Sequence, residues 1–436
     1  MKVMKFGGTS VGSADRMKEV ANLVSDGEKN IVVLSAMSGT TNNLVEISNY
    51  LHKKNHDGAN RLINQLEKKY HEEIDLLYKN AKIKEEAIEV VKSRFDFIKS
   101  LVKDEFSEVE EKEILAQGEL MSTAMVNFYL NEQGKDSVLI PALEFMKTNS
   151  DGEPDITFIK ENIKKYLDNH KDNKILITQG YICRNVNDEI DNLQRGGSDY
   201  TASLIGAAVN ADEIQIWTDI DGMHNNDPRY VENTKSIAEL SFDEAAELAY
   251  FGAKILHPTS VLPAKVANVP VRLLNTMEPK APGTTISGKD TKNRITAVAA
   301  KDGITAIRIH SGRMLMAYGF LRKVFEIFEN HKTPIDMITT SEVGVSVTID
   351  KLKHLDEIVD ELKTFGSVEV DSDLVIICIV GDLVRENKGY ANRIFDALKD
   401  IPLRMISYGG SDHNISVLVS SENKKEALRA LSAKLF

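Results

Sequence analysis

Two glycine-containing stretches, far apart in the chain, each follow an apolar run typical of a strand and precede a helical pattern. They are KFGGTSVG at residues 5–12 and QRGGSDYTA at residues 194–202. Glycine lets the backbone approach a ligand closely, and the amide groups at the start of a helix attract an anion. The two stretches therefore predict a nucleotide-phosphate site on a parallel α/β sheet and indicate phosphoryl transfer, although no GxxxxGK[ST] loop is present.

The apolar pattern places this sheet before about residue 290. Strands are expected at residues 3–6 and 31–36, with a helix at 15–25 between them. Residues 43–131 then repeat apolar side chains at helical spacing without strand signals, which predicts a helical excursion from the sheet. The remaining elements of this α/β region are strands at 137–140, 175–178 and 214–218 and a helix at 198–210.

The pattern changes after residues 279–293, which are rich in Pro, Gly, Thr and Lys and mark a boundary rather than the interior of an element. Two similar units follow. In each, a helix that begins at a glycine (Gly319 or Gly389) leads to two strands, and a methionine (Met337 or Met405) lies early in the first strand. We expect a small domain present in two copies, the simpler alternative being a chance similarity between apolar strands.

Charge and cysteine content exclude several classes of function. The net charge of −12 and the pI near 5.5 argue against nucleic acid as a partner. Cys183 and Cys378 lie far apart without CxxC spacing, which fits a reducing compartment and predicts neither a disulfide framework nor a cysteine metal site. The chain starts directly in a strand pattern, and no apolar run approaches the roughly 18 residues of a membrane span. We expect a soluble, cytoplasmic protein without a membrane partner.

Lys5 is the first candidate for chemistry, because its neighbours Val3, Met4 and Phe6 are apolar and would desolvate its ammonium group. An anion at the carboxyl edge of the sheet would compensate for that loss. The alternative is a lysine that protects an edge strand from aggregation, with the following glycines forming only a tight turn.

The second glycine stretch combines a guanidinium with helix-start residues. Arg195 offers a planar fork for a carboxylate, whereas Ser198 and Asp199 fall where helix N-cap residues belong. A capped helix start would explain Ser198 or Asp199 alone, but it requires neither the arginine nor the two glycines.

Three further stretches are more ambiguous. Residues 217–229 follow a strand and form either a surface loop or a loop that contacts the nucleotide through Asp219 or Arg229. A single histidine such as His224 is more often a surface residue than a ligand. Lys254, late in a helical pattern, would complement the helix dipole or contact a phosphate. Glu119 lies on the polar side of an apolar helix and on composition alone would be solvated.

At these residues the chain resembles the aspartate kinases, a branch of the amino acid kinase superfamily. KFGGTSV, SAMSGTTN, QGEL, RGGSDYTA, WTDIDG with DPR, and FGAKILHP follow one another in the order expected of that family. The resemblance implies an α/β fold in which an amino acid kinase-like αβα sandwich precedes two ACT regulatory domains of the βαββαβ, ferredoxin-like type. The implied boundaries are 1–290 for the catalytic domain, 304–371 for the first ACT domain, and 291–303 plus 372–436 for the second.

The resemblance further implies transfer of the ATP γ-phosphoryl group to the β-carboxylate of L-aspartate, the first step towards lysine, threonine and methionine. Lys5 would then be catalytic, with Asp199 orienting it. Aspartate would be held by Thr41, Glu119, Arg195 and Ser198. ATP would lie against Lys5, Gly7, Gly8, Thr218, Asp219, His224, Arg229, Lys254 and Ile255. ATP is expected to arrive with Mg²⁺ held mostly by its phosphates and by water, so no metal site of the protein itself is expected. His224 stands where some relatives carry tyrosine, which leaves its role open.

The C-terminal stretch is similar to that of the lysine-sensitive branch, which implies feedback inhibition by L-lysine. The implied effector pocket lies at an ACT–ACT interface of a homodimer, with a tetramer left open, and consists of Met314, Phe320, Leu321, Ile335, Asp336, Ser341 and Glu342. Asp336 and Glu342 would supply negative charge for an ammonium group. Without the resemblance, both acids would be interpreted as a solvated strand end. Threonine remains open as a further effector, and the length up to Phe436 leads us to expect a monofunctional enzyme.

Two other functions stay open at this point. One is an amino acid kinase that acts on a different carboxylate, which the SAMSGTTN and QGEL stretches disfavour. The other is a catalytically silent amino-acid sensor, which loss of Lys5 or Asp199 would have favoured; both residues are present.

Overall fold

The computed structural model describes residues 1–193, 196–252, 256–289, 294–312, 318–383 and 388–436. These residues form two compact units. The first comprises Met1–Met223, Ala238–Phe242 and Ile255–Lys289, and the second comprises His224–Ile237, Asp243–Lys254 and Asp290–Phe436. The domain boundaries expected from the sequence stay a prediction.

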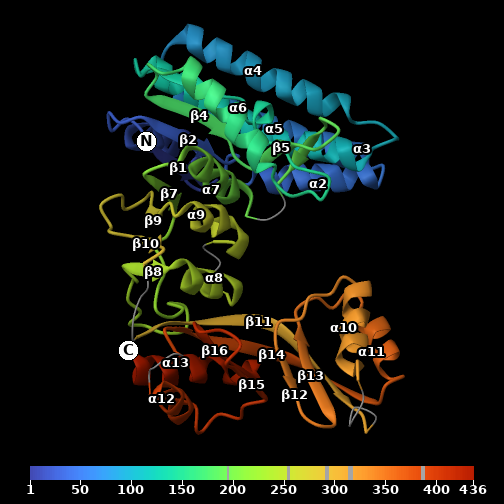
Figure 1. The fold of residues 1–436 in the computed structure, drawn as a ribbon. Coiled ribbons are helices and arrows are strands. Elements are labelled where there is room, and N and C mark those ends of the chain that lie inside the picture. Colours follow the sequence, from blue (N-terminus) through green and yellow to red (C-terminus); the bar gives the residue numbers. More distant parts are fainter. Residues whose placement is uncertain (194–195, 253–255, 290–293, 313–317, 384–387) are drawn as a thin grey trace. The chain divides into compact units, whose positions relative to one another are not determined.

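The first unit is built on an eight-stranded sheet (Figure 1). All its strand pairs are parallel except β9 with β10. Every residue of β2 is buried, which is the near-continuous apolar pattern of a parallel strand covered on both faces. In spatial order the strands are β3 (Ser137–Leu139), β4 (Ile175–Gln179), β2 (Asn30–Leu34), β1 (Lys2–Phe6), β7 (Glu213–Thr218), β9 (Val271–Asn275), β10 (Thr284–Ser287) and β8 (Glu239–Ser241).

One sequence expectation about this sheet is wrong in part. The two units divide between Lys289 and Asp290, inside the segment 279–293, but the same segment also contains strand β10 and so includes the interior of an element. Thr284 and Ile286 are buried and alternate with partly exposed residues, so the short run pairs with β9 and β8 despite its polar composition.

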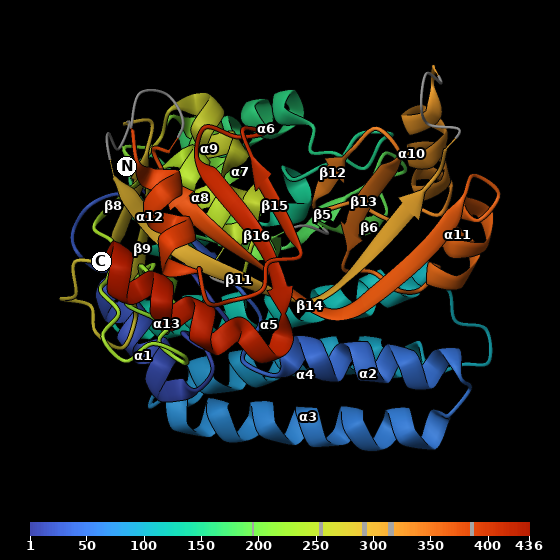
Figure 2. The same ribbon diagram turned by 90° about the horizontal axis from the view of Figure 1, so that it is seen from below.

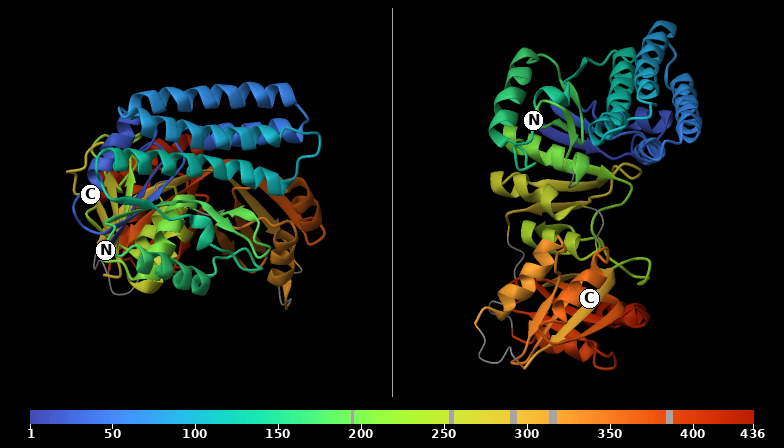
Figure 3. Two further views of the ribbon diagram at one scale, coloured as in Figure 1. Left: turned by 90° about the horizontal axis from the view of Figure 1, so that it is seen from above. Right: turned by 90° about the vertical axis from the view of Figure 1, so that its right-hand side faces the viewer.

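The helical excursion is confirmed as four long helices. They run side by side, as Figure 2 and Figure 3 show, and each contacts the next along the chain. The side chain of Asn80 caps the third of them, and Ser107 forms a capping box with Glu110 at the start of the fourth. The four are α2 (Thr40–His52), α3 (His56–Leu77), α4 (Ala81–Ser100) and α5 (Glu108–Glu132).

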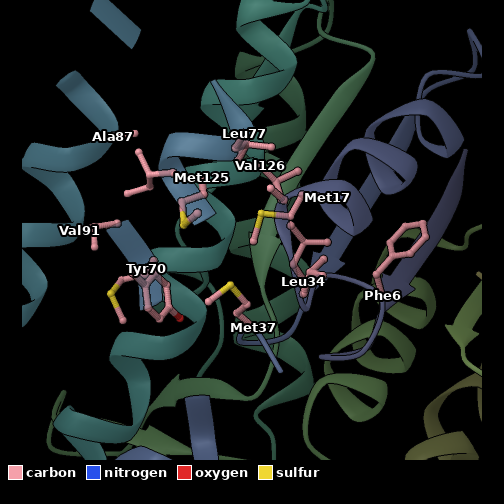
Figure 4. Packing of buried hydrophobic residues seen from close by; sticks show 14 of the residues in the cluster. Phe6, Met17, Leu34, Met37, Tyr70, Leu77, Ala87, Val91, Met125 and Val126 are labelled. Atoms are coloured by element: carbon pink, nitrogen blue, oxygen red, sulfur yellow. The ribbon is translucent and has the colours of Figure 1, made fainter. Parts of the chain in front are cut away.

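The core of the first unit joins these helices to the sheet. Figure 4 shows Tyr70, Val91 and Met125 together between the helices, with Met17 and Leu34 nearer the sheet, and all five belong to one buried cluster. The long apolar stretch of α5 is buried from Ile114 to Val126 except for Leu120, so this helix lies inside the unit. The remaining elements are α1 (Ala14–Leu23), α6 (Ile156–Asn169), α7 (Gly197–Val209), α9 (Leu262–Ala267), the 3₁₀ turns at Ala142–Glu144 and Pro258–Val261, and the hairpin of β5 (Ile182–Arg184) with β6 (Ile190–Asn192).

The second unit contains a six-stranded antiparallel sheet in which the two copies of the predicted repeat meet. Two long strands, β11 and β14, pass through both copies. Residues 295–301 of β11 pair with 376–381 of β14, whereas residues 304–310 pair with 367–374. In spatial order the strands are β12 (Ile338–Thr340), β13 (Gly344–Ile349), β11 (Ile295–His310), β14 (Ser367–Gly381), β16 (Asn414–Ser420) and β15 (Met405–Tyr408).

Each copy has its own apolar core and helix pair, and the pair α10 and α11 is visible beside β13 in Figure 1. The predicted helix–strand–strand order is confirmed in both copies. No helix among the residues described is long and apolar enough to cross a membrane. The helices are α8 (Phe242–Tyr250), α10 (Phe320–Asn330), α11 (Leu355–Leu362), α12 (Tyr390–Ala397) and α13 (Lys424–Leu435), and a 3₁₀ turn spans Ser421–Asn423.

Candidate active site

Lys5 and Asp199 form an ion pair at the carboxyl ends of the central strands. Lys5 lies in β1 and is 9% exposed, and its Nζ is 2.6 Å from Oδ1 of Asp199 in the first turn of α7. Strand β1 lies between β2 and β7, so Lys5 is not an edge-strand lysine and that alternative is wrong. The burial of its ammonium group is compensated by the carboxylate, as the sequence required.

The glycines after β1 leave the backbone bare beside this ion pair. The N–H of Gly7 donates to the carbonyl of Trp217 at 3.2 Å, which ties the turn to the end of β7. A Cβ on Gly7 would lie 3.4 Å from Nζ of Lys5, and one on Gly8 would lie 3.0 Å from the carbonyl oxygen of Ala36. A side chain on Gly8 would therefore crowd the neighbouring loop, and one on Gly7 would contact the lysine.

The start of α7 differs from the sequence prediction. The N-cap is Gly196 at φ +76°, and the helix begins at Gly197, so Ser198 and Asp199 lie in its first turn rather than at the cap. Only glycine adopts such a left-handed conformation without strain, and the turn therefore needs no polar N-cap side chain. The hydroxyl of Ser198 instead accepts a hydrogen bond from that of Ser35 at 2.9 Å.

Glu119 is buried rather than solvated. It is 3% exposed because α5 is covered by the sheet and by its neighbouring helices. The N–H of Ala36 donates to its Oε1 at 3.1 Å, whereas Oε2 has no hydrogen-bond partner among the described residues. Burial raises the pKa of Glu119 to about 8, against the smaller lowering by the backbone hydrogen bonds. This oxygen can therefore accept a hydrogen bond from a donor that the described part of the chain does not supply.

Glu119 and Ser198 line one cavity of about 440 Å³, whereas Lys5 and Asp199 are not among its lining residues. It brings together five of the predicted site residues: Gly8, Thr41, Glu119, Ser198 and Asp219. The hydroxyl of Thr218, at the end of β7, donates to Oδ1 of Asp219 at 3.1 Å. The cavity also contains Tyr181, which the sequence reasoning did not single out, and further members of the quoted stretches KFGGTSV, SAMSGTTN and RGGSDYTA, namely Thr9, Ser35, Ala36, Met37, Ser38, Gly39, Asn42 and Gly197.

Tyr181 is the cavity residue that the sequence reasoning missed. It follows β4 by two residues and has φ +68°, a conformation that is rare and strained for an aromatic residue. Its N–H donates to the hydroxyl of Thr201 at 2.9 Å. Burial, and after it the charge of Glu119, raises the pKa of Tyr181 to about 12. Its place just beyond the carboxyl end of a parallel strand was the available signal.

Several other predicted contacts do not belong to the described part of the first unit. His224 and Arg229 belong to the second unit, where Nδ1 of His224 is 2.9 Å from the hydroxyl of Thr234 and Arg229 pairs with Asp227 at 2.6 Å. Arg195, Lys254 and Ile255 lie outside the described residues.

The predicted effector residues occupy one copy of the repeat in the second unit. Phe320 is buried and Leu321 is exposed at the start of α10, while Ser341 and Glu342 are exposed in the turn between β12 and β13. Ile335 and Asp336 precede β12, and Ile335 packs against the same apolar cluster as Phe320. Met314 lies outside the described residues.

The two predicted effector acids differ in burial. The side chain of Asp336 is only 1% exposed, so its interpretation as a solvated strand end is wrong. Glu342 is exposed, as that interpretation expected.

Comparison with protein families gives two matches. The profile of the Amino acid kinase family matches residues 1–275, and that of an ACT domain matches residues 377–435. Over its whole length the chain is 35% identical to lysine-sensitive aspartokinase 3 of Escherichia coli, covering 99% of that protein. It is also 35% identical to chloroplastic aspartokinase 2 of Arabidopsis thaliana, of which it covers 84%.

Solved structures give the same assignment. The fold superposes on E. coli aspartokinase III in complex with aspartate and ADP, described as the R-state, with a TM-score of 0.85 at 33% identity and full coverage of both chains. Against the same enzyme with lysine and aspartate, described as the T-state, the TM-score is 0.82, with 100% of this chain and 99% of that chain covered. The aspartate kinase of Clostridium acetobutylicum matches with a TM-score of 0.85 at 27% identity, with both chains fully covered.

Proposed function

The chain belongs to the amino acid kinase family as an aspartokinase, and on this premise we propose that it transfers the γ-phosphoryl group of ATP to the β-carboxylate of L-aspartate. The observation that carries the proposal is the joining of two kinds of group in one place. An ammonium–carboxylate pair and bare glycine backbone lie at the C-terminal end of β1 and in the first turn of α7. A cavity beside them contains Glu119, one of whose carboxylate oxygens has no hydrogen-bond partner among the described residues. The first set suits a phosphoryl group and the second suits an amino acid.

The reaction needs charge neutralisation more than proton transfer. A side-chain carboxylate with an ordinary pKa of about 3.9 is already ionised at pH 7, so it can attack without a general base. One of its oxygens bonds to the γ-phosphorus while the bond from that phosphorus to the β–γ bridging oxygen breaks, giving 4-phospho-L-aspartate and ADP. Lys5 neutralises charge on the transferring group, and Asp199 holds the lysine in place.

Glu119 is assigned to the substrate ammonium group. Its free Oε2 faces no donor among the described residues, and a cationic donor would satisfy it at a charge-assisted distance. Thr41 and Ser198 line the same cavity and offer hydroxyls to the substrate carboxylates. Arg195 is retained as a carboxylate ligand from the family resemblance alone.

Aspartate binding is expected to release close to one proton at pH 7. Glu119 has a pKa of about 8 in the free protein, so it is mostly protonated at pH 7, and it must ionise to pair with the ammonium group. Calorimetric titrations at pH 7 in phosphate and in Tris, which differ in ionisation enthalpy, measure the number of protons. Repeating them at pH 9 should give a value near zero, because Glu119 is then already ionised. The same proton number at both pH values would contradict the assignment.

Magnesium is expected to enter with the nucleotide. Among the described residues no group of three or more His, Cys, Asp or Glu side chains could hold a metal ion. This donor set fits an ion that keeps its waters and the ATP phosphates, with Asp219 of the cavity as a single additional carboxylate. When bound, the ion would neutralise the phosphate charge.

Chelation should therefore abolish turnover without weakening the fold. With EDTA in excess, activity should fall to background and return on adding excess MgCl₂, while the Tm of the nucleotide-free protein stays within about 1 °C. A Tm that drops on chelation would show a structural ion instead.

The activity itself is tested by ADP formation from MgATP with L-aspartate, compared with glutamate, acetylglutamate and UMP as acceptors. Turnover that depends on aspartate supports the proposal. Preference for another acceptor would mean that the protein is a kinase of a different carboxylate or of a nucleotide, and not of aspartate. Absence of turnover with any acceptor would favour an amino-acid sensor.

Regulation by L-lysine is the second half of the proposal. It rests on the whole-length relationship to a lysine-sensitive enzyme and on the near-complete burial of Asp336. We place the effector in a homodimer formed through the ACT domains, which a tetramer could extend. The two free, buried cysteines accord with a location in the cytoplasm.

A further inference from the structure

Helix α8 bears a polar stripe that fastens it to both copies of the ACT repeat. The stripe consists of Glu244, Glu247 and Tyr250, which follow one another at intervals of three residues and therefore lie on neighbouring turns of one side. All three belong to the second unit, as does the sheet that they contact.

The first two members of the stripe hold strands of the sheet. Glu244 is fully buried, and the hydroxyl of Thr296 on β11 donates to its Oε1 at 2.6 Å. The carboxylate of Glu247 accepts from the hydroxyl of Ser411 at 2.8 Å and from the amide of Asn414 at 2.6 Å. Ser411 and Asn414 lie between β15 and the start of β16, in the C-terminal copy.

The third member of the stripe reaches the other copy. The phenol of Tyr250 donates to Oδ1 of Asp336 at 2.6 Å, and Nζ of Lys301 donates to the same oxygen at 2.7 Å. The ammonium group of Lys301 also lies 4.5 Å from the centre of the Tyr250 ring and 3.0 Å from Oδ2 of Asp350. Asp336 thus binds α8 through one carboxylate oxygen.

This cluster has more negative than positive charge. It contains one ammonium group, that of Lys301, and two carboxylates, those of Asp336 and Asp350. Burial by itself lowers the pKa of Lys301, but hydrogen bonds and charges from the two acids outweigh it and raise that pKa. Among the described residues, Oδ2 of Asp336 and Oδ1 of Asp350 are buried without a hydrogen-bond partner. The cluster can therefore accept a second cationic donor.

The chain presses against the sheet directly after α8. Gly252 has φ +122°, and a Cβ at this position would lie 2.2 Å from the carbonyl oxygen of Ala300, the residue before Lys301. In the sequence the next residues are 253–255, which include Lys254 and Ile255, the predicted nucleotide contacts.

We propose that the Tyr250–Asp336–Lys301 cluster is the regulatory contact through which an amino-acid effector acts on α8. The inference rests on the proposed lysine regulation. An effector ammonium group that arrives at Asp336 competes with Lys301 and with the phenol of Tyr250 for the same carboxylate. Binding therefore weakens the hold of the sheet on the end of α8 that leads into residues 253–255. Tyr250 is a positioning residue in this scheme and does not touch the reacting atoms.

The test compares Tyr250→Phe with Tyr50→Phe. Tyr50 is the matched control because its phenol also donates to a carboxylate, Oε1 of Glu46 at 3.0 Å, on the surface of α2. Without lysine, Tyr50→Phe should keep kcat and KM within about two-fold of wild type, whereas Tyr250→Phe should already lose part of its activity, because one of the two donors that hold α8 to Asp336 is gone. Tyr250→Phe should bind lysine at least as tightly by calorimetry, because a competitor for Asp336 is gone. The ratio of its activity without lysine to its activity at saturating lysine should fall about five-fold or more, and that ratio should not change in Tyr50→Phe.

Two outcomes would overturn the inference. One is a Tyr250→Phe enzyme with wild-type activity without lysine and wild-type inhibition by lysine, and the other is parallel loss of lysine binding and inhibition, which would make Tyr250 part of the pocket or of the fold. Amide hydrogen exchange gives a readout besides activity. Lysine should speed exchange in residues 242–250 of the wild-type protein, and unchanged exchange there would also overturn the inference.

The same experiment separates this inference from the proposed function. A wild-type enzyme that phosphorylates aspartate but neither binds nor responds to lysine would remove the effector assignment, and this inference with it, while the kinase stands. A protein without turnover whose α8 still responds to lysine would reject the kinase and keep the contact.

Discussion

Replacing Lys5 with methionine is expected to lower kcat by about 10²- to 10³-fold, the loss found when one preorganised donor to a charged transition state is removed. Methionine keeps most of the volume of the lysine stem in the buried strand, so the fold should persist. The carboxylate of Asp199 would lose its ion-pair partner and would repel the phosphates. Steady-state kinetics with MgATP and aspartate, together with a thermal melt of each protein, measure both effects.

The control for Lys5 is Lys2→Met on the same strand. Lys2 pairs with Glu28 at 2.7 Å, and its side chain is 27% exposed. It has no contact with the cavity in the proposal, so kcat should stay within about two-fold. A folded Lys5→Met enzyme with wild-type turnover would refute the role assigned to Lys5.

The second large effect is expected from Glu119→Gln, which should raise the KM for aspartate about 10- to 100-fold. An amide oxygen still accepts a hydrogen bond but lacks the charge that the substrate ammonium group requires, and hydrogen bonds to charged groups contribute about 1.5–3 kcal/mol. kcat at saturating aspartate should change less, because Glu119 is assigned to binding and not to the transferring phosphoryl group. A KM within two-fold of wild type would place the ammonium group elsewhere.

The same substitution should alter stability in a pH-dependent way. The pKa of Glu119 is about 8 in the folded protein against an ordinary value of 4.5, so between these pH values the folded state binds a proton that the unfolded state lacks. This contribution to stability is complete below pH 4.5 and is lost as the pH rises through 8. Glutamine does not titrate, so the variant does not lose this stability as the pH rises. The Tm of Glu119→Gln minus that of the wild type should therefore increase from pH 5 to pH 9. Glu89→Gln, at an exposed position of α4, should show no such trend.

The sheet and the long helices followed from the sequence because their patterns are local. A lysine among apolar neighbours predicted the burial of Lys5, and the structure supplies its partner, Asp199. The burial of Glu119 did not follow, because nothing in the sequence of α5 says that its polar side faces the loop after β2. Likewise, the strand β10 is decided by pairing with β9 and β8 rather than by its own composition.

The site shows the same division between local and distant information. Gly8, Thr41, Glu119, Ser198 and Asp219 come from five separate stretches, and only the family resemblance grouped them before the structure placed them around one cavity. Tyr181 escaped notice because its defining property is a positive φ, which the aromatic side chain gives no reason to expect. Asp336 looked solvated because its partners Lys301 and Tyr250 are distant in sequence.

Because the strands β11 and β14 pass through both ACT copies, the two copies differ in how easily a deletion could remove them. Ile304 pairs with Leu374 and Ala306 pairs with Asp371 at the point where the chain passes from one copy to the other, so the two ends of the intervening copy lie on adjacent paired strands. The intervening copy could be excised by one deletion and a short turn, and the rest of the sheet would still be continuous. The outer copy is made of two separated segments and could be lost only by two cuts. A lineage that shed regulation would thus be expected to discard the inner copy, which contains Asp336.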